Sequence, residues 1–338
     1  MSEKPVKTIA DIAEICCVSK STVSRALNDS PQISDETKAR IHAVAKEHRF
    51  QINIPARRLS LQRSHTIAFV VVSHQPDDCF SVADLFVLEM LGAVSSTLST
   101  YHYDLLVANI DPRDPDWPCQ YLESGRADGF ILLASTRKQL HVKTLIKTGA
   151  PFIVWGMPLP HQRYCSVVND NFDGGKKATE HLLRKGKRRI AFIGGPADEF
   201  ETQQRYEGYV AALQESGQEV NPEVVSYGEW TSESGAQQTQ QILQSVPDVD
   251  AIFANSDLMA TGAINLLHAQ GWRVPLDIAV VGYDDLSLAK LNNPPLTTIS
   301  QKIPQVGKLL AQNLIEYIKT GLVTNVIVPA ELVVRESA

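Results

Sequence analysis

The side chains best suited to chemistry near the start of the chain are hydrogen-bond donors on two short segments, TIADIAEI and SKSTVSRALN. They are Thr8, Lys20, Ser21, Thr22, Ser24 and Arg25. Lys20 and Arg25 can donate to guanine or to phosphate, and Ser21 can contact the edge of either class of base. Thr8 and Ser24 are suited to phosphate oxygens. If a helix places these donors in the major groove, their chemistry is DNA recognition. The alternative is a small helical bundle with solvated polar faces.

Three short helices are predicted to position these donors. Thr8 can cap the first helix with Asp11 three residues later, and Ser19 and Ser34 can cap the second and third. Apolar residues recur at helical spacing behind each cap, which favours a small bundle. Residues 1–50 are therefore predicted to form a helix-turn-helix domain, and the basic, proline-containing residues 51–64 are predicted to form a linker.

Length and charge bound the remainder. The 338 residues allow two or three domains, and 43% hydrophobic residues suit a globular protein. Residues 1–62 contain ten Lys/Arg and seven Asp/Glu, which gives a net charge of +3. The rest of the chain has a net charge of −9, so the whole chain has −6. This split indicates that only the head meets a polyanion. No apolar run reaches the ~18 residues of a membrane span. The segment MSEKPVKTIADIAEI lacks the apolar core of a signal peptide, so a cytoplasmic protein is expected.

The five cysteines indicate neither a disulfide framework nor a metal site. Cys16, Cys17, Cys79, Cys119 and Cys165 are odd in number and scattered, and no C-x-x-C pair occurs. Adjacent side chains on a helix point about 100° apart, so Cys16 and Cys17 cannot readily hold one ion. We predict that both are structural, with a redox role as the alternative. No cofactor is predicted.

From His65 onward, short apolar strands alternate with helical patterns such as EMLGAVSSTLSTY and GAINLLHAQG. The predicted strands are TIAFVVVS, YDLLVANI, DGFILLAS, PFIVWG, SVVND, RIAFIGG, VVSYG, AIFANS, IAVVGYD, LTTIS and VIVPAELVV. This alternation is typical of parallel sheets covered by helices on both faces. The strands are too many for one compact sheet, so two similar halves are expected, opening with TIAFVVVS and RIAFIGG.

Ligands of such sheets bind beyond the carboxyl ends of the strands. The residues at those ends are Ser73, Trp155, Asn169, Gly194, Trp230, Ser256 and Asp284. The body contains no matched nucleophile, base and orienting group and no metal-spaced cluster, which argues against an enzyme. The GGP stretch at 194–196 favours a tight loop over a phosphate cradle, because no G-x-G-x-x-G or P-loop motif occurs.

Motifs along the whole chain resemble the lactose-repressor (LacI/GalR) family of bacterial transcription regulators. They are TIADIAEICCVSKSTVSRALN, NIPARRL, VVNDNFDGGKKATEHLLRKGKRRIAFIGG, RYEGYVAAL, FANSDLMATGAI, VPLDIAVVGYDD and PPLTTISQ, in the family's order and spacing. One departure is the pair Cys16–Cys17, where the family usually has Ala-Gly in the turn. Glycine suits a positive φ there, so Cys17 must tolerate strain or reshape the turn. Cys16 matches a small buried residue.

The resemblance implies an all-α helix-turn-helix head and an α/β body of two lobes, like that of periplasmic binding proteins. The amino-terminal lobe is expected at about 65–168 and 300–327, and the carboxy-terminal lobe at about 169–299 and 328–338. A homodimer is expected on a near-palindromic operator, because the tail of the family's tetramers is missing. The linker is expected to fold into a hinge helix that contacts DNA through Asn53, Ala56, Arg57 and Leu59. Leu59 would wedge into the minor groove; packing in an ordinary linker is the alternative.

The resemblance also implies an effector site between the lobes. Arg205 and Asp284 match the family's effector-binding arginine and aspartate, Trp230 falls where the family often has an aromatic residue, and Ser256 matches a polar position. Weaker candidates on the other lobe are Ser73, Phe80, Trp155 and Asn169. A carboxylate accepts hydrogen bonds from hydroxyls and a guanidinium donates to their oxygens, which suits a sugar. Gly156 stands where some sugar-binding members carry an acid, which leaves the sugar's identity open.

Each of these assignments has an alternative. Arg205 and Asp284 could form a structural salt bridge, and Trp230 could be a half-buried packing residue. Asp257 is predicted to cap a helix beginning at Leu258. The expected function is a repressor of sugar-utilisation genes, controlled by a monosaccharide, oligosaccharide or glycoside. The alternative is a regulator that responds to a purine, a nucleoside or a protein co-regulator. A periplasmic sugar-binding protein would share the body but not the head.

Overall fold

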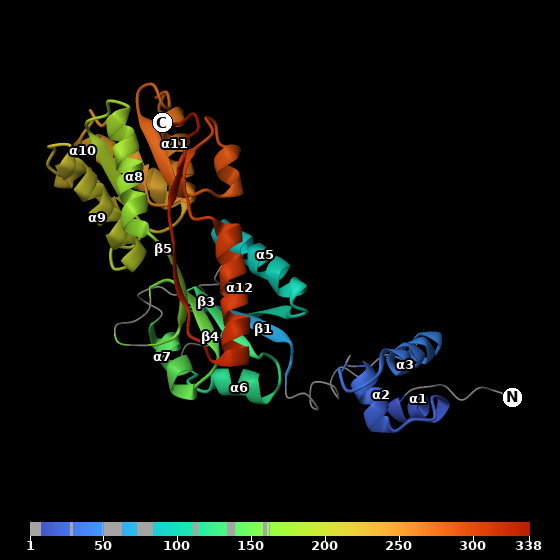
Figure 1. Cartoon of the computed structure of the whole chain (residues 1–338). Coiled ribbons are helices and arrows are strands. Elements are labelled where there is room, and N and C mark those ends of the chain that lie inside the picture. The colour runs from blue at the N-terminus through green and yellow to red at the C-terminus, as the bar shows by residue number, and fades with distance from the viewer. Residues whose placement is uncertain are drawn as a thin grey trace. The chain divides into compact units, whose positions relative to one another are not determined.

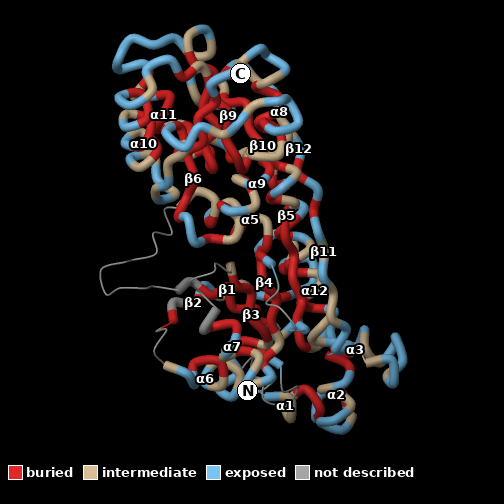
Figure 2. Tube along the Cα trace, turned by 90° about the vertical axis from the view of Figure 1, so that its left-hand side faces the viewer, coloured by how far each residue is buried: buried red, intermediate tan, exposed pale blue. Residues whose placement is uncertain are grey.

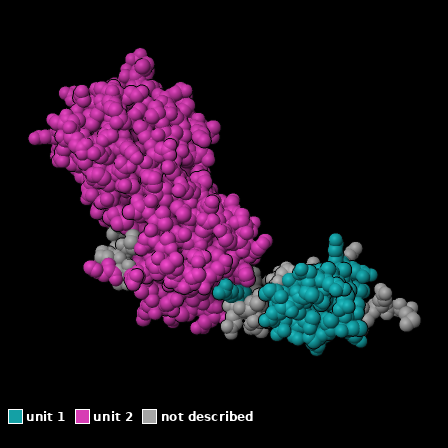
Figure 3. Space-filling view, in the orientation of Figure 1, with its two compact units in different colours: residues 1–63 teal, residues 64–338 magenta. Residues whose placement is uncertain are grey.

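The computed structural model describes residues 8–27, 30–48, 50, 63–72, 84–110, 114–133, 139–157, 161 and 163–338. The chain divides into two compact units, residues 1–63 and residues 64–338 (Figure 3). No helix in these ranges is both long and apolar enough to cross a membrane.

The first unit is a bundle of three helices, α1 (Ile9–Ile15), α2 (Lys20–Leu27) and α3 (Asp35–Glu47) (Figure 1). Thr8 and Asp11 form the predicted capping box: the Thr8 N–H donates to Asp11 Oδ2 at 2.8 Å, and the Asp11 N–H donates to Thr8 Oγ1 at 3.2 Å. Ser19 and Ser34 accept hydrogen bonds from the N–H groups of Thr22 and Thr37, as a capping residue does. The bundle's core is formed by Ile12, Ala13, Cys16, Val23, Ala26, Leu27, Ile41 and Ala45.

The two adjacent cysteines occupy the turn between α1 and α2. Cys17 has a φ of 51°, so it takes the left-handed conformation that was predicted to suit glycine and tolerates the strain. Cys16 is buried in the bundle's core, and burial raises the pKa of its thiol. A raised pKa keeps the thiol protonated and less reactive, which favours the structural interpretation of Cys16.

The second unit contains two six-stranded sheets with the same strand order, β11-β5-β4-β3-β1-β2 and β12-β10-β9-β8-β6-β7. The strands of the first sheet are β1 (Thr66–Val72), β2 (Asp104–Ile110), β3 (Gly129–Leu133), β4 (Phe152–Trp155), β5 (Cys165–Asn169) and β11 (Asn325–Val328). The strands of the second are β6 (Ile190–Gly194), β7 (Val225–Tyr227), β8 (Ala251–Ala254), β9 (Ala279–Asp284), β10 (Thr297–Ser300) and β12 (Glu331–Val333). Only the β10–β12 pair among these is antiparallel. The predicted two similar halves are confirmed.

Helices cover both faces of each sheet, which is why the central strands are buried along their length (Figure 2). The first sheet packs with α5 (Leu85–Thr100), α6 (Trp117–Glu123), α7 (Gln139–Thr148) and α12 (Ile303–Thr320). The second packs with α8 (Asn171–Arg184), α9 (Phe200–Glu215), α10 (Ser232–Ser245) and α11 (Asp257–Ala269). Two 3-10 turns, η2 (Pro222–Val224) and η3 (Ser287–Lys290), complete the second half.

The chain crosses between the two halves three times, after β5, after β10 and after β11. The last crossing corrects one prediction. The stretch VIVPAELVV was expected to be one strand, but it forms β11 in the first sheet and β12 in the second. Pro329 and Ala330 separate the two strands. Proline has no N–H to donate to a sheet ladder, so it favours a break at this point.

Candidate functional site

The donors predicted to meet DNA lie on or beside α2. Lys20, Ser21 and Arg25 are exposed, whereas Thr22 and Ser24 are half-buried. Ser19 organises the start of the helix, because its Oγ lies 2.7 Å from Ser21 Oγ and accepts from the Thr22 N–H at 3.1 Å. Lys20 therefore lies at a preorganised helix start, and Arg25 adds a second exposed cation in the last turn of α2.

The remaining predicted DNA contacts are Thr8, which precedes α1, and the four hinge residues. The Thr8 hydroxyl lies 2.8 Å from Asp11 Oδ2, so its proton serves the capping box, although the residue itself is exposed. The hinge residues Asn53, Ala56, Arg57 and Leu59 lie outside the described residues, as do Ser73 and Phe80 of the predicted effector site.

Arg205, on α9, lies at the centre of a buried polar cluster. Its side chain is only 4% exposed. Nε donates to Asn171 Oδ1 at 2.9 Å, and Nη1 donates to the backbone oxygen of Asn255 at 2.6 Å. The guanidinium carbon lies 3.6 Å from the centroid of the Tyr283 ring and 5.7 Å from that of Trp230. The planar guanidinium is thus fixed by two directed hydrogen bonds and by stacking.

The structural salt bridge considered for Arg205 and Asp284 is not among the ion pairs of the described residues. Asp284 ends β9 with a φ of 125° and is 6% exposed. Its Oδ1 accepts a hydrogen bond from Gln301 Nε2 at 2.6 Å. Burial raises the pKa of Asp284 to about 7, and the carboxylate of Asp84 adds to the rise, while Arg205 and the hydrogen bond from Gln301 oppose it. The carboxyl group is therefore poised to change its charge near neutral pH.

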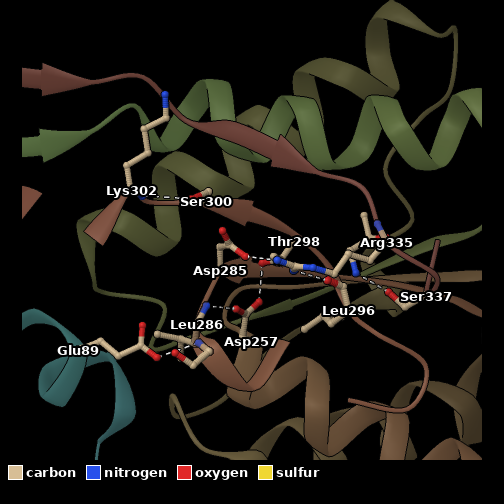
Figure 4. A network of polar contacts seen from close by, with 12 residues as sticks. Glu89, Asp257, Asp285, Leu286, Leu296, Thr298, Ser300, Lys302, Arg335 and Ser337 are labelled. Atoms are coloured by element: carbon tan, nitrogen blue, oxygen red, sulfur yellow. Dashed lines mark hydrogen bonds and ion pairs between the residues drawn. The ribbon is translucent and has the colours of Figure 1, made fainter. Parts of the chain in front are cut away.

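Asp257 supports the segment that follows Asp284 (Figure 4). Its Oδ2 accepts from the Leu286 N–H at 2.8 Å, and its Oδ1 accepts from the Thr298 hydroxyl at 2.5 Å. Burial and the neighbouring Asp284 raise the pKa of Asp257 well above its usual range. Asp285 forms an ion pair with Arg335. The buried carboxyl groups of Asp257 and Asp284 thus influence each other electrostatically, a feature that is common at ligand-binding sites.

The cap of α11 corrects a second prediction. Asp257 was expected to cap a helix beginning at Leu258, but α11 begins at Asp257 and its N-cap is Ser256. The Ser256 hydroxyl oxygen accepts from the Met259 N–H at 3.2 Å. The hydroxyl proton of Ser256 remains able to donate.

Trp230 lies against Gly195, the residue that follows β6. A Cβ added to Gly195 would lie 2.5 Å from the indole ring of Trp230. The glycine thus provides room for the tryptophan, which explains the GGP stretch without a phosphate cradle. Trp230 is half-buried and also packs against the core of the second sheet, so it combines packing with a position beside Arg205.

Two candidates from the first sheet, Trp155 and Asn169, are both buried at the ends of strands. Trp155 is buried in the core that joins the first sheet to α5 and α12, which favours a packing role. Asn169, at the end of β5, is buried, and no hydrogen bond to its Oδ1 is present in the structure. Gly156 has a φ of 136°, a conformation that side chains rarely adopt.

The structure brings Arg205 and Trp230 together and adds residues that sequence reasoning missed. These are Asn171, Tyr283, Asn255, Gln301 and Asp84. Asn255 is fully buried, and neither atom of its side-chain amide has a hydrogen-bond partner. Asn171, Tyr283 and Asn255 each lie within two residues of a strand end, so inspecting neighbours of the strand-end residues could have found them.

The described residues contain no group of three or more His, Cys, Asp and Glu side chains that could hold a metal ion. The cluster can instead donate hydrogen bonds from a fixed guanidinium and a free amide, and accept them at a carboxylate. An aromatic face lies beside these groups. This combination suits a neutral ligand with several hydroxyl groups or ring heteroatoms.

Comparisons with known proteins agree with the description of both compact units. Residues 8–53 match the family described as bacterial regulatory proteins, lacI family, and residues 179–338 match a periplasmic binding protein-like domain. The HTH-type transcriptional regulator CelR of Thermobifida fusca is 35% identical over all of both chains. The HTH-type transcriptional repressor PurR of Aliivibrio salmonicida is 30% identical over 92% of each.

Two solved structures are similar along nearly the whole chain. The transcriptional regulator CelR–cellobiose complex superposes with a TM-score of 0.73 at 34% identity, covering 98% of this chain and 99% of that one. The lac repressor dimer bound to operator and the anti-inducer ONPF has a TM-score of 0.81 at 26% identity, covering 99% of each chain. The chain therefore belongs to the LacI family, and it is a DNA-binding transcriptional regulator rather than an enzyme.

Proposed function

We propose that this regulator is a homodimeric repressor of sugar-utilisation genes, released from or held on its operator by a small carbohydrate bound between the two halves of the second unit. The observation that carries the proposal is the buried Arg205, fixed over Tyr283 and beside Trp230, with Asp284 as an acceptor at the end of β9. The ligand shifts the regulator between two arrangements by its difference in affinity for them.

The charge of the site supports a neutral ligand. The carboxylate of Asp84 raises the pKa of Asp284, and Asp284 raises the pKa of Asp257. The positive charge of Arg205 lowers the pKa of Asp284. A phosphorylated or carboxylated ligand would add negative charge among these carboxyl groups. A sugar instead offers hydroxyls to the unpaired amide of Asn255 and to Oδ1 of Asn169, and an apolar face to Trp230. The cellobiose complex of the similar CelR supports the same class.

A second candidate effector is a purine or nucleoside, favoured by the similarity to PurR. A flat purine could stack on Trp230 and pair with the Asn255 amide. A protein co-regulator is a third possibility from the sequence, and no contact of the described residues favours it over a small molecule.

Thermal unfolding of the full chain separates these effectors. A ligand that binds only the folded state raises its stability by about 2.7 kcal/mol at a concentration of 100 Kd. In a panel of neutral sugars and glycosides, charged sugars and purines, we expect cellobiose or another neutral glycoside to raise the melting temperature. Glucose 6-phosphate and galacturonate should fail, since they add a charge near the carboxyl groups. A rise with hypoxanthine or guanosine and none with any sugar would replace the carbohydrate by a purine.

Operator binding is proposed for the exposed face of α2, with Lys20, Ser21 and Arg25 at base edges. Thr8, Thr22 and Ser24 are proposed to contact phosphates or neighbouring bases. The hinge residues Asn53, Ala56, Arg57 and Leu59 are proposed to contact the minor groove, one set from each protomer, at a near-palindromic site. The similar lac repressor dimer bound to operator supports this arrangement. We also propose that the protein acts in the cytoplasm, on the nucleoid.

Arg25→Ala tests the groove contact. We expect operator affinity to fall by about 10- to 100-fold, because a bidentate arginine contact to guanine contributes ~1–3 kcal/mol. Arg40→Ala is the matched control, since Arg40 is an exposed arginine on α3 and its loss removes the same charge. Binding is measured by fluorescence anisotropy with an operator selected from random duplexes by the wild type. Equal losses in the two variants would mean that Arg25 contributes only charge, and effector binding should be unchanged in both.

A further inference from the structure

The segment that begins at the effector aspartate reaches from the second sheet into the half that contains the first sheet. It comprises Asp284, which ends β9, and the next three residues, Asp285, Leu286 and Ser287. Asp284 and Asp285 have positive φ values of 125° and 60°, so two successive residues with side chains are held in conformations that favour glycine. Such a conformation persists only where the surroundings hold it in place.

Contacts from both halves hold this segment, in addition to those of Asp284 with Gln301 and Asp285 with Arg335. Leu286 is fully buried, and its side chain belongs to the core of the first sheet, with residues of α5 and α12. The Ser287 N–H donates to Glu89 Oε1 of α5 at 2.8 Å. The Leu286 N–H donates to Asp257 within its own half. Figure 4 shows Glu89 on α5 approaching the segment from the side opposite Asp257.

Glu89 is also connected to Asp284 through its own helix. Asp84 caps α5 by accepting from the Phe86 N–H at 3.0 Å, and its carboxylate acts electrostatically on Asp284. The first turns of α5 therefore act on the effector aspartate through the charge of Asp84 and on the segment after it through the hydrogen bond to Glu89. Leu286 and residues of α5 and α12 share the core of the first sheet, so this core is the physical connection between the segment and that half.

We propose that Glu89 is a positioning residue that holds the Asp284–Ser287 segment and thereby couples effector binding to the half that the chain enters directly after the DNA-binding head. The chain enters that half at β1, directly after the first unit. Glu89 does not contact the effector in this proposal; it fixes the backbone that presents Asp284. The proposal rests on the proposed function, in which Asp284 binds the effector.

Glu89 is a gentler position to test than Leu286 or Asp257. Its side chain is half-buried, so its removal leaves no cavity in a core and lets water reach the Ser287 N–H. Glutamine at this position retains an oxygen that can accept from Ser287 but removes the charge. The pair Glu89→Ala and Glu89→Gln therefore separates the hydrogen bond from the charge.

The experiment uses the full chain, an operator selected by the wild type, and cellobiose as the probe, with each variant measured with and without the sugar. The coupling factor is the ratio of the two operator dissociation constants, which is about 5–150 for typical allosteric proteins. For Glu89→Ala we expect this factor to fall by about tenfold and the cellobiose Kd to rise by about 3- to 10-fold. Operator affinity without sugar and the melting temperature should stay near wild type.

Glu89→Gln should restore most of the coupling, because glutamine keeps an oxygen that accepts from the Ser287 N–H. If the negative charge of Glu89 were what matters, Glu89→Gln would not restore it. Glu316→Ala on α12 is the matched control, because it removes an exposed glutamate from the same half. If the wild type responds to cellobiose and Glu89→Ala responds equally, the coupling role is wrong while the proposed function stands. If Glu89→Gln behaves like Glu89→Ala, the hydrogen bond to Ser287 is not the coupling contact. If neither cellobiose nor any sugar of the panel changes operator binding by the wild type, the proposed function itself is wrong and this role falls with it.

Discussion

Replacing Arg205 by lysine is expected to weaken effector binding by about 100-fold and to leave operator binding by the effector-free protein near wild type. The guanidinium donates to Asn171 from Nε and to the Asn255 backbone from Nη1, while its plane stacks on Tyr283. An ammonium cannot reproduce these directions together. Hydrogen bonds to a charged group contribute ~1.5–3 kcal/mol, so losing the geometry of two of them accounts for the expected change.

Isothermal titration of the full chain with the sugar identified in the thermal panel measures this effect. Lysine keeps the positive charge, which limits the damage to the fold that Arg205→Ala would cause by leaving buried acceptors unpaired. Arg184→Lys is the matched control, because Arg184 lies on α8 in the same half and is exposed. An Arg205→Lys variant that binds the sugar as tightly as Arg184→Lys would exclude Arg205 from the effector site.

The fold was predictable because its signals are local. The buried parallel strands are short apolar runs, and the starts of α1, α3, α5, α8, α10 and α11 carry a Ser, Thr or Asp cap, so patterns along the chain identify these elements. The stretch VIVPAELVV failed because β-propensity does not record which sheet a strand joins. Its two ends pair with β5 and β10, which lie in different sheets. Pro329 marks the break between them, but only the tertiary arrangement shows which sheet each part joins.

The candidate site was predictable in part, for a different reason. Arg205 and Asp284 followed from the resemblance to a family, whereas their partners depend on distances between separate elements. Tyr283 looks like a core residue of an apolar strand, yet its ring supports the guanidinium. The exchange of roles between Ser256 and Asp257 is a shift of one residue at a helix start, where sequence patterns are least decisive.

Replacing Asp284 by asparagine is expected to stabilise the ligand-free protein at pH 8 and to abolish its response to the effector. The pKa of Asp284 is about 7 in the folded protein, above the ordinary 3.8, mainly because of burial. The folded state therefore favours the protonated form. Its stabilising contribution is fully present below pH 3.8 and is lost as the pH rises through about 7. A shift of this size corresponds to about 4 kcal/mol in all, with about 2–3 kcal/mol of it lost between pH 5 and 8.

Urea unfolding at pH 5, 6, 7 and 8 measures the difference between the two proteins. We expect the free energy of unfolding of the wild type to fall relative to Asp284→Asn as the pH rises, because asparagine stays neutral. Asp277→Asn is the control: its pKa is lowered to about 2 by hydrogen bonds from Arg273, so its contribution is lost only as the pH falls through that value. It should be constant between pH 5 and 8. Both substitutions replace a carboxyl group by a nearly isosteric amide, so a change in side-chain volume does not affect the comparison of the two variants.

The same experiment with saturating sugar links this instability to function. Sugar hydroxyls that donate to the ionised carboxylate favour its charged form, so the sugar should stabilise the wild type more at pH 8 than at pH 5. Asp284→Asn has no charge to stabilise and should gain little at either pH. If the wild type were as stable as the variant at pH 8, burial would not destabilise the ionised carboxylate of Asp284. A sugar effect independent of pH in the wild type would place the hydroxyl contacts on other groups, with the Asn255 amide the first to examine.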